Sequence, residues 1–292
     1  MLDGNGVFDA GLSKISCTNQ PHETEYFYHS QSFWEFVYVK RGFALCGGLG
    51  NSVLLCTGDF AVIAPGEEHS LIASADSELY CCLFSDTEIT NIREEIFSLP
   101  GFIELSLRAK AQNKQSKAIT YESIRLDFAE RQEFMRLCER INIERINKNR
   151  GWQTLVRSYL AEILVFYSRL DITAKRAEKE NDTVKATVEA IIKYLEANYS
   201  SNVTGAELAK ISGVTTEHIL KQFKNELSIS PSEYLRRYRI AKSMEMLRSS
   251  DLAVSDIAKL CGFVDMSAYS RLFKQYEGET PSNYRKRFQI FG

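Results

Sequence analysis

One eight-residue pattern occurs twice near the end of the chain, as ELAKISGV at Glu207–Val214 and as DIAKLCGF at Asp256–Phe263. Each copy is followed by a Phe-Lys pair and then by a Ser/Thr-Pro-Ser segment that leads to Tyr234 or Tyr284. The apolar residues have helical spacing, and the glycine supplies a turn that other residues enter only at a cost. The repeat therefore predicts two units, each with a short helix, a glycine turn and a second helix, which is the plan of a helix-turn-helix.

Capping signals agree with these helix boundaries. Thr204–Glu207 and Ser230–Glu233 both have the sequence of a capping box, and a proline follows Ser230 as it follows Thr280. The second helix of a helix-turn-helix enters the major groove of DNA, so its outward face holds the candidate base-reading residues. These are Thr216, Glu217, Leu220 and Lys221 in the first unit, and Met266, Ser267, Ser270 and Arg271 in the second.

Basic residues near these faces predict how DNA would be held. The repeat places Lys221 and Arg271 at the same position, and both side chains can donate hydrogen bonds to guanine O6 and N7. For each single residue, the alternative is a solvated charge that touches no DNA. Further basic residues are candidates to neutralise phosphates: Lys224, Lys274, Arg236, Arg237 and the cluster Arg285–Arg287.

The first part of the chain has a different pattern. Short segments rich in aromatic and β-branched residues alternate with glycine-bearing turns, which predicts an all-β barrel or sandwich. The predicted strands are Thr24–His29, Phe33–Lys40, Ser52–Cys56, Phe60–Ile63 and Glu78–Phe84.

Helical spacing follows the predicted strands. Thr87–Leu99 is expected to be a helix ended by Pro100, and Tyr121–Lys148 and Trp152–Tyr167 are expected to form an antiparallel pair. This pair either forms a dimerisation surface or packs on the chain's own barrel, and the sequence leaves both open. Asp171–Asp182 is charged and almost without large apolar residues, so it is the candidate linker.

Length and composition narrow the class of protein. The 292 residues correspond to about two domains, and the values of 44 % hydrophobic and 25 % charged residues are typical of globular proteins. No apolar run is long enough to span a bilayer, and the first residues lack the features of a secretory signal. Seven cysteines without a CxxC motif favour reduced thiols in a cytoplasm over a disulfide framework or a zinc site.

Charge differs between the two parts of the chain. From Thr183 onwards, 16 Lys and Arg outnumber 12 Asp and Glu, whereas the rest of the chain carries a net charge of −6 within a total of −2. An acidic part joined to a mildly basic part indicates two separate roles. No nucleophile–base arrangement and no phosphate-binding glycine loop is present, so we predict that the chain is not an enzyme and needs no cofactor.

The C-terminal residues resemble the AraC/XylS family of bacterial transcription regulators over about 100 residues. The resemblance rests on Ile257–Phe263, Ser270–Lys274 and Gly278–Ser282, followed by Tyr284 and Arg285. It implies two helix-turn-helix units that are joined by a long helix, about Pro231–Leu247, and that read successive faces of the major groove. The chain departs from the family at Ser228, where glycine is usual, at Ala268-Tyr269, where a bulky aromatic pair is usual, and at Glu217 and Leu220, where donors are usual.

The N-terminal part is similar, less specifically, to the cupin-like effector domain of the same family. His29, Glu35–Val39 and Gly42 lead to Gly58–Pro65 and His69. The resemblance implies that a small molecule, often a sugar or other metabolite, binds inside the barrel, and that helices within 121–170 dimerise. Strand alternation cannot place all the candidate effector residues inside the barrel. They are Tyr26, Tyr28, His29, Trp34, Glu35, Tyr38 and His69.

A metal site is the alternative for this barrel. Cupin enzymes bind a divalent metal through two His and a Glu in a first motif and one His in a second. Here His29, Glu35 and His69 stand at matching positions, but Gln31 replaces one His and is a poor ligand beside histidine. Regulators of this family usually bind no metal, so we expect none.

Together these observations predict an α+β protein. Residues 1–100 are expected to form a cupin-like β-barrel (a jelly roll), 101–170 an accessory helical pair, 171–183 a linker and 184–292 an all-α domain of two helix-turn-helix units. The expected function is effector-responsive regulation of transcription in the cytoplasm, with double-stranded DNA, a small molecule, a second copy of the chain and RNA polymerase as partners, and no membrane. The alternatives are a metal-binding cupin, enzyme or sensor, fused to a DNA-binding domain, and a constitutive DNA-binding dimer with a ligand-free barrel.

Overall fold

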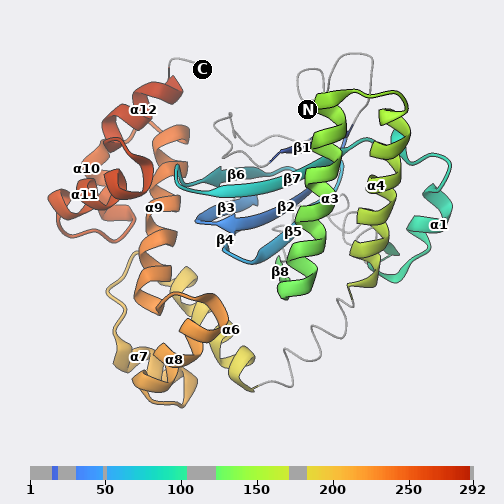
Figure 1. The fold of residues 1–292 in the computed structure, drawn as a ribbon. Helices are drawn as coiled ribbons and strands as arrows, with labels where there is room; N and C mark the ends of the chain where they lie inside the picture. The colour runs from blue at the N-terminus through green and yellow to red at the C-terminus, as the bar shows by residue number, and fades with distance from the viewer. Residues whose placement is uncertain (1–14, 19–30, 49–50, 104–122, 171–182, 290–292) are drawn as a thin grey trace. The chain divides into compact units, whose positions relative to one another are not determined.

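A computed structural model describes residues 15–18, 31–48, 51–103, 123–170 and 183–289 of the chain (Figure 1). The chain divides into two compact units, residues 1–71 with 77–172 and residues 72–76 with 173–292. The predicted linker lies outside the described residues except for Thr183. None of the helices in the described ranges is both long and apolar enough to cross a bilayer.

The first unit contains two β-sheets. The five-stranded sheet has the order β1-β7-β2-β5-β8, and the three-stranded sheet has the order β4-β3-β6. The central strand β2 pairs antiparallel with β5 on one side and with β7 on the other. The strand bounds are β1 Ile15–Thr18, β2 Trp34–Arg41, β3 Phe43–Gly48, β4 Asn51–Cys56, β5 Asp59–Ile63, β6 Ser70–Ala73, β7 Glu78–Phe84 and β8 Ser123–Arg125.

Two helices cover one face of the five-stranded sheet (Figure 1). Helix α3 (Phe128–Asn147) and helix α4 (Trp152–Arg169) lie side by side, and their buried residues belong to one core with strands β2, β5 and β7. The Phe134 ring of α3 meets the Phe60 ring at a centroid distance of 5.0 Å, and the Tyr167 ring of α4 meets the Phe36 ring at 5.2 Å. The helical pair therefore packs on the chain's own sheet, which is one of the two alternatives left open by the sequence.

Most of the strand predictions are confirmed within the described residues. The predicted Glu78–Phe84 matches β7 at both ends, the segments assigned to β4 and β5 begin one residue late, and the segment assigned to β2 is shifted by one residue at both ends. The predicted strand Thr24–His29 lies outside the described residues. Strands β1, β3 and β6 were missed, because β3 ends in two glycines and β1 and β6 have only four residues each.

Two helix predictions in this unit are wrong in part. The predicted helix 121–148 starts too early, because Ser123–Arg125 forms β8, Arg125 makes a 2.8 Å ion pair with Asp59, and Asp127 then caps α3. The predicted helix 87–99 is a 3₁₀ turn, η1 (Asp86–Glu88), and a short helix, α1 (Arg93–Phe97). Residues 100–103 are helical again, so Pro100 opens a helical turn, where its missing N–H costs nothing.

From Thr183 onwards, the second unit consists of helices and the turns between them in its described residues. Helices α7 and α8 form the first helix-turn-helix, α10 and α11 form the second, and the long helix α9 connects them (Figure 1). The bounds are α6 Thr183–Ala197, α7 Gly205–Ser212, α8 Thr216–Leu227, α9 Pro231–Ser249, α10 Val254–Leu260, α11 Met266–Glu277 and α12 Pro281–Gln289. The predicted α+β fold class is thus confirmed, with a cupin-like sheet domain and an all-α domain.

The repeated aromatic residues form equivalent contacts in the two helix-turn-helix units. Phe223 and Tyr234 meet edge to face in the first unit at 6.4 Å, and Phe273 and Tyr284 do so in the second at 5.3 Å. One predicted cap differs from expectation. Ser230 accepts a hydrogen bond from the Glu233 amide, but the Glu233 carboxylate does not return the bond and pairs with other side chains instead.

Candidate nucleic-acid interface and effector site

The two recognition helices, α8 and α11, are equivalent residue by residue. Thr215 caps α8 and Asp265 caps α11, and each helix has 12 residues. Both helices end at a residue with left-handed backbone, Ser228 with φ of 60° and Gly278 with φ of 73°. Every position of α8 therefore has its counterpart fifty residues later in α11.

The buried and exposed faces of these helices agree with the predicted assignment. Ile219 and Phe223 of α8, and Tyr269 and Phe273 of α11, are buried in the core of their unit. Thr216 and Ser270 are half-buried. The other candidate base-reading or phosphate-binding residues on the two helices are exposed: Glu217, Leu220, Lys221, Lys224, Met266, Ser267, Arg271 and Lys274.

Four basic side chains on this face have no oppositely charged partner among the described residues. Lys221, Lys224, Arg271 and Lys274 make no ion pair with any other described residue. Their charge is therefore available to an anionic partner such as the phosphates of DNA, and the guanidinium of Arg271 can donate two parallel hydrogen bonds to one base.

Several predicted phosphate contacts have partners within the second unit. Arg236 and Arg237 both bind Glu233, at 2.8 and 2.9 Å, and the Tyr276 hydroxyl donates to the same carboxylate at 2.6 Å. Burial alone would raise the pKa of Glu233, but the hydrogen bonds from Tyr276 and the two arginines outweigh it and lower the pKa. Arg237 is largely covered, so its role as a phosphate contact is not supported, whereas Arg236 keeps an exposed guanidinium.

This network joins the two helix-turn-helix units. Glu233 lies in α9, directly after the first unit, and Tyr276 lies in α11, the recognition helix of the second unit. The hydrogen bond between them holds α11 against the connecting helix. Sequence reasoning missed it, since 43 residues separate the two partners.

The C-terminal cluster Arg285–Arg287 is also partly engaged. Arg287 forms a 2.8 Å ion pair with Glu279 and lies over the Phe288 ring, and Arg285 is half-buried. Lys286 is exposed and makes no ion pair with the described residues. Of this predicted cluster, Lys286 is the best placed to meet a phosphate.

The predicted effector residues divide between the two faces of strand β2. Side chains alternate along a strand, so Trp34 and Tyr38 point to one face and Glu35 to the other. The Trp34 indole N–H donates to Asp86 at 2.6 Å, and the Tyr38 ring meets Phe134 of α3. Both aromatic residues therefore face the covering helices, and the prediction that they line the barrel is wrong.

Glu35 and His69 form a buried polar group on the opposite face. The Gln31 amide donates to the Glu35 carboxylate at 3.2 Å, and His69 Nε2 lies 3.6 Å from the same oxygen, Oε2. The other ring nitrogen, Nδ1, lies 3.0 Å from the Glu67 carbonyl oxygen. Burial alone would lower the pKa of His69, but the nearby Glu35 carboxylate and the contact with the Glu67 carbonyl outweigh it, so the pKa is raised.

Tyr26, Tyr28 and His29 lie outside the described residues. Within the described ranges, no three His, Cys, Asp or Glu side chains come close enough to hold a metal ion.

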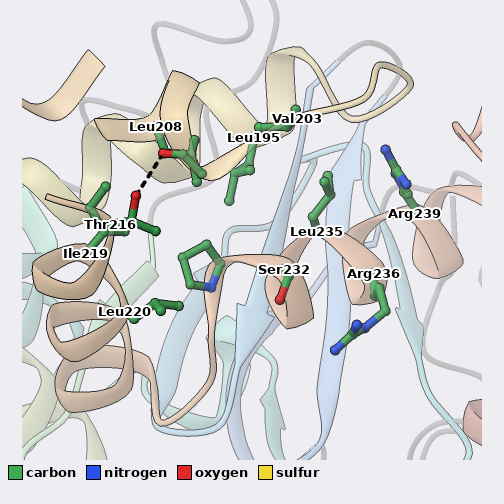
Figure 2. A pocket seen from close by; sticks show the side chains of 12 residues that line it. Leu195, Val203, Leu208, Thr216, Ile219, Leu220, Ser232, Leu235, Arg236 and Arg239 are labelled. Carbon is green, nitrogen blue, oxygen red and sulfur yellow. Dashed lines mark hydrogen bonds between the residues drawn. The ribbon is translucent and has the colours of Figure 1, made fainter. Parts of the chain in front are cut away.

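A pocket of about 260 Å³ lies in the first helix-turn-helix unit (Figure 2). It is enclosed by α6, α7, α8 and the start of α9, and most of its lining is apolar. Thr216, Ile219 and Leu220 of the recognition helix form one wall, and Pro231, Ser232 and Leu235 of α9 form another (Figure 2). No pattern in the sequence indicated this pocket.

Family models match both units of the chain. The model described as an AraC-like ligand binding domain matches residues 15–164, just over half of the chain, and the model described as a helix-turn-helix domain matches residues 208–287. The chain belongs to the AraC/XylS family. This confirms the resemblance inferred from the C-terminal repeat.

Individual members of the AraC/XylS family match mainly over part of the chain. A lactose operon transcription activator of Staphylococcus xylosus is 27 % identical over 50 % of this chain and 51 % of its own length. A raffinose operon transcriptional regulatory protein of Pediococcus pentosaceus is 31 % identical over 39 % of this chain and 42 % of its own length. The chain thus spans about two-fifths to half of the length of the curated relatives it matches.

Among solved structures, a probable AraC family transcriptional regulator from Rhodopseudomonas palustris CGA009 is 26 % identical. The match covers 35 % of this chain and 97 % of that chain, with a TM-score of 0.34.

Proposed function

We propose that this member of the AraC/XylS family is a sequence-specific, DNA-binding transcription regulator that responds to a small molecule. One observation carries the proposal. Two recognition helices, α8 and α11, match position by position, and the basic side chains on their outward faces make no ion pair with the part of the chain that the structure describes. A surface of this kind suits the major groove, where base edges are read and phosphates are neutralised.

The effector is proposed to be a sugar or another small metabolite with hydroxyl groups. Glu35, His69 and Gln31 are buried polar side chains on one face of the five-stranded sheet, and such groups can exchange hydrogen bonds with hydroxyls. The names of two relatives refer to lactose and raffinose operons, which supports the sugar class for this chain. Tyr26, Tyr28 and His29 stay candidates for the same site.

A homodimer is proposed to form through the outer surface of the helical pair. The inner faces of α3 and α4 are buried on the sheet, yet Phe128, Ile143, Ile146 and Leu155 leave large apolar surfaces exposed, with Phe128 72 % and Ile146 71 % exposed. Ile143, Ile146 and Leu155 lie at the adjoining ends of α3 and α4, and exposed apolar surface of this kind is a candidate interaction site. In this proposal the protein acts in the cytoplasm, contacts RNA polymerase at a promoter, and is not an enzyme.

Reciprocal binding tests the central part of the proposal. A thermal-shift screen with sugars, other metabolites and divalent metals would first identify the effector, since a ligand at 100 times its dissociation constant adds about 2.7 kcal/mol to stability. Fluorescence anisotropy would then give the DNA affinity with and without that effector, and calorimetry the effector affinity with and without DNA. Linkage requires both affinities to change by the same factor.

Each outcome bears on a different part of the proposal. If the DNA affinity and the effector affinity change by the same factor, in either direction, the result supports an effector-responsive regulator. Specific DNA binding with no ligand in the panel would favour a constitutive DNA-binding dimer, and a thermal shift with a divalent metal alone would favour a metal sensor or enzyme. Absence of sequence-specific DNA binding would reject the proposal as a whole.

A further inference from the structure

The two recognition helices differ in chemistry at two positions of the outward face. At the second position of the helix, α8 carries Glu217 and α11 carries Ser267. At the fifth position, α8 carries Leu220 and α11 carries Ser270. The backbone of the two helices is equivalent, so these side chains occupy corresponding places in the two units. The chemistry that each unit offers to DNA is therefore different at the same geometric positions.

Leu220 is not buried in the hydrophobic core of its helix-turn-helix unit. The other large apolar residues of α8, Ile219, Phe223 and Leu227, are buried, whereas Leu220 is 46 % exposed. It lines the 260 Å³ pocket, as do Ile219 and Leu235 (Figure 2). One side of the leucine thus borders an apolar wall, and the other is open to solvent on the outward side of the recognition helix.

Glu217 lies three residues before Leu220, so the two side chains are neighbours on the helix surface. It is exposed and makes no ion pair with any described residue. An unpaired carboxylate next to the phosphates of DNA is repelled unless it meets a hydrogen-bond donor. In the major groove, the amino group N4 of cytosine is such a donor.

From this contrast we propose that the first unit selects pyrimidines. Leu220 contacts the 5-methyl group of a thymine, and Glu217 accepts a hydrogen bond from the N4 amino group of a neighbouring cytosine. These are the base features that apolar and acidic side chains recognise, whereas the two serines of the second unit fit several bases. The inference rests on the proposed function and adds the base features that the first unit reads.

In vitro selection tests this directly. The full chain would be used to select duplexes from a randomised pool, in parallel with Leu220→Ser and Glu217→Ser, which place the residue types of the second unit in the first. We expect the wild-type site to hold a thymine and a cytosine next to each other in one half. Leu220→Ser should lose the thymine preference, Glu217→Ser should lose the cytosine preference, and the other half should stay unchanged.

Removing one methyl group from the DNA tests the proposed contact between Leu220 and thymine. Replacing the selected thymine by deoxyuridine removes only the methyl group, and the wild-type affinity should fall about fourfold, which corresponds to roughly 0.8 kcal/mol for one buried methyl-sized group. For Leu220→Ser, thymine and deoxyuridine should bind equally. The matched control is Leu260→Ser, which removes a leucine of similar exposure (49 %) from α10 and should leave the methyl effect intact.

The outcomes separate this inference from the proposed function. The Leu220 contact would be overturned if no thymine methyl group in either half of the wild-type site affected the affinity. It would also be overturned if the effect of the methyl group persisted in Leu220→Ser. Retention of the cytosine preference in Glu217→Ser would overturn the Glu217 contact. A wild-type selection that enriches no sequence would instead overturn the proposed function. Thermal melts of the variants ensure that a lost preference is not caused by unfolding.

Discussion

The two helix-turn-helix units share a backbone and differ in their surroundings and surfaces. Buried residues such as Phe223 and Phe273, together with the turn glycines Gly213 and Gly262, keep the two units alike. The exposed positions of α8 and α11 have diverged. A repeated unit can therefore keep the residues that fix its geometry while the residues that meet a partner change, and each class of residue can be tested separately.

The largest expected effect concerns the two turn glycines. Both have positive φ, 70° at Gly213 and 79° at Gly262. A Cβ added at Gly213 would meet no atom within 4 Å, whereas a Cβ added at Gly262 would lie 2.7 Å from the Tyr199 carbonyl oxygen. Gly213→Ala should lower the free energy of unfolding by about 1–2 kcal/mol through backbone strain alone. Gly262→Ala should add a clash and cost about 2–5 kcal/mol in total. Urea denaturation measures both, and equal losses would contradict the difference in surroundings.

The next effect compares the two basic base-reading residues. Arg271→Ala should lower affinity for the selected site by about 1–3 kcal/mol and relax the base preference at one position. Lys221→Ala should have a smaller effect on specificity, because its ammonium group cannot make the bidentate contact of a guanidinium. Competition binding with single-base variants measures both changes. Lys259→Ala, which removes an exposed lysine paired with Asp256, is the control. If Arg271→Ala left the base preference unchanged, the assignment of the outward face would be wrong.

The repeat, the caps and the hydrophobic periodicity predicted the second unit well, since those signals are local. Long-range pairing was not predictable. The sequence predicts phosphate contacts at Arg236 and Arg237, but both pair with Glu233, whose hydrogen bond from Tyr276 forms only where α11 lies against α9.

Strand β2 shows a second feature that could not be predicted from the sequence, namely which face of the strand each side chain occupies. Its residues Trp34–Val39 are all buried, one face against helices α3 and α4 and the other away from them. Alternation along a strand is visible in a sequence only when one face is polar. The sequence thus could not assign Trp34 and Tyr38 to the helix side and Glu35 to the other side, although it identified Glu35 and His69 as candidates.

A smaller effect is expected from a phosphate contact. Lys274 is exposed in the last turns of α11 and makes no ion pair with the described residues. Lys274→Ala should weaken all DNA sequences alike and reduce the slope of log affinity against log salt concentration by about 1. Titrations at several salt concentrations with specific and random duplexes measure this. Loss of affinity for the specific duplex alone would show that Lys274 reads a base.

The smallest effect concerns the ends of the recognition helices. Ser228 closes α8 with φ of 60°, where α11 has Gly278 with φ of 73°. Left-handed backbone favours glycine, so Ser228→Gly should raise the free energy of unfolding by up to about 1 kcal/mol. The reverse exchange, Gly278→Ser, should lower it by a similar amount. Thermal denaturation measures both, and a destabilising Ser228→Gly would show that the serine side chain has a stabilising contact.

Methylation protection tests the central claim most directly, because dimethyl sulfate modifies guanine N7 in the major groove. The full chain bound to a selected duplex should protect two groups of guanines on one face of the DNA, about 10–10.5 base pairs apart, one for each recognition helix. In Arg271→Ala, protection should weaken in one group only. Protection of a single group, or of guanines without this spacing, would contradict the claim that α8 and α11 occupy successive turns of the major groove.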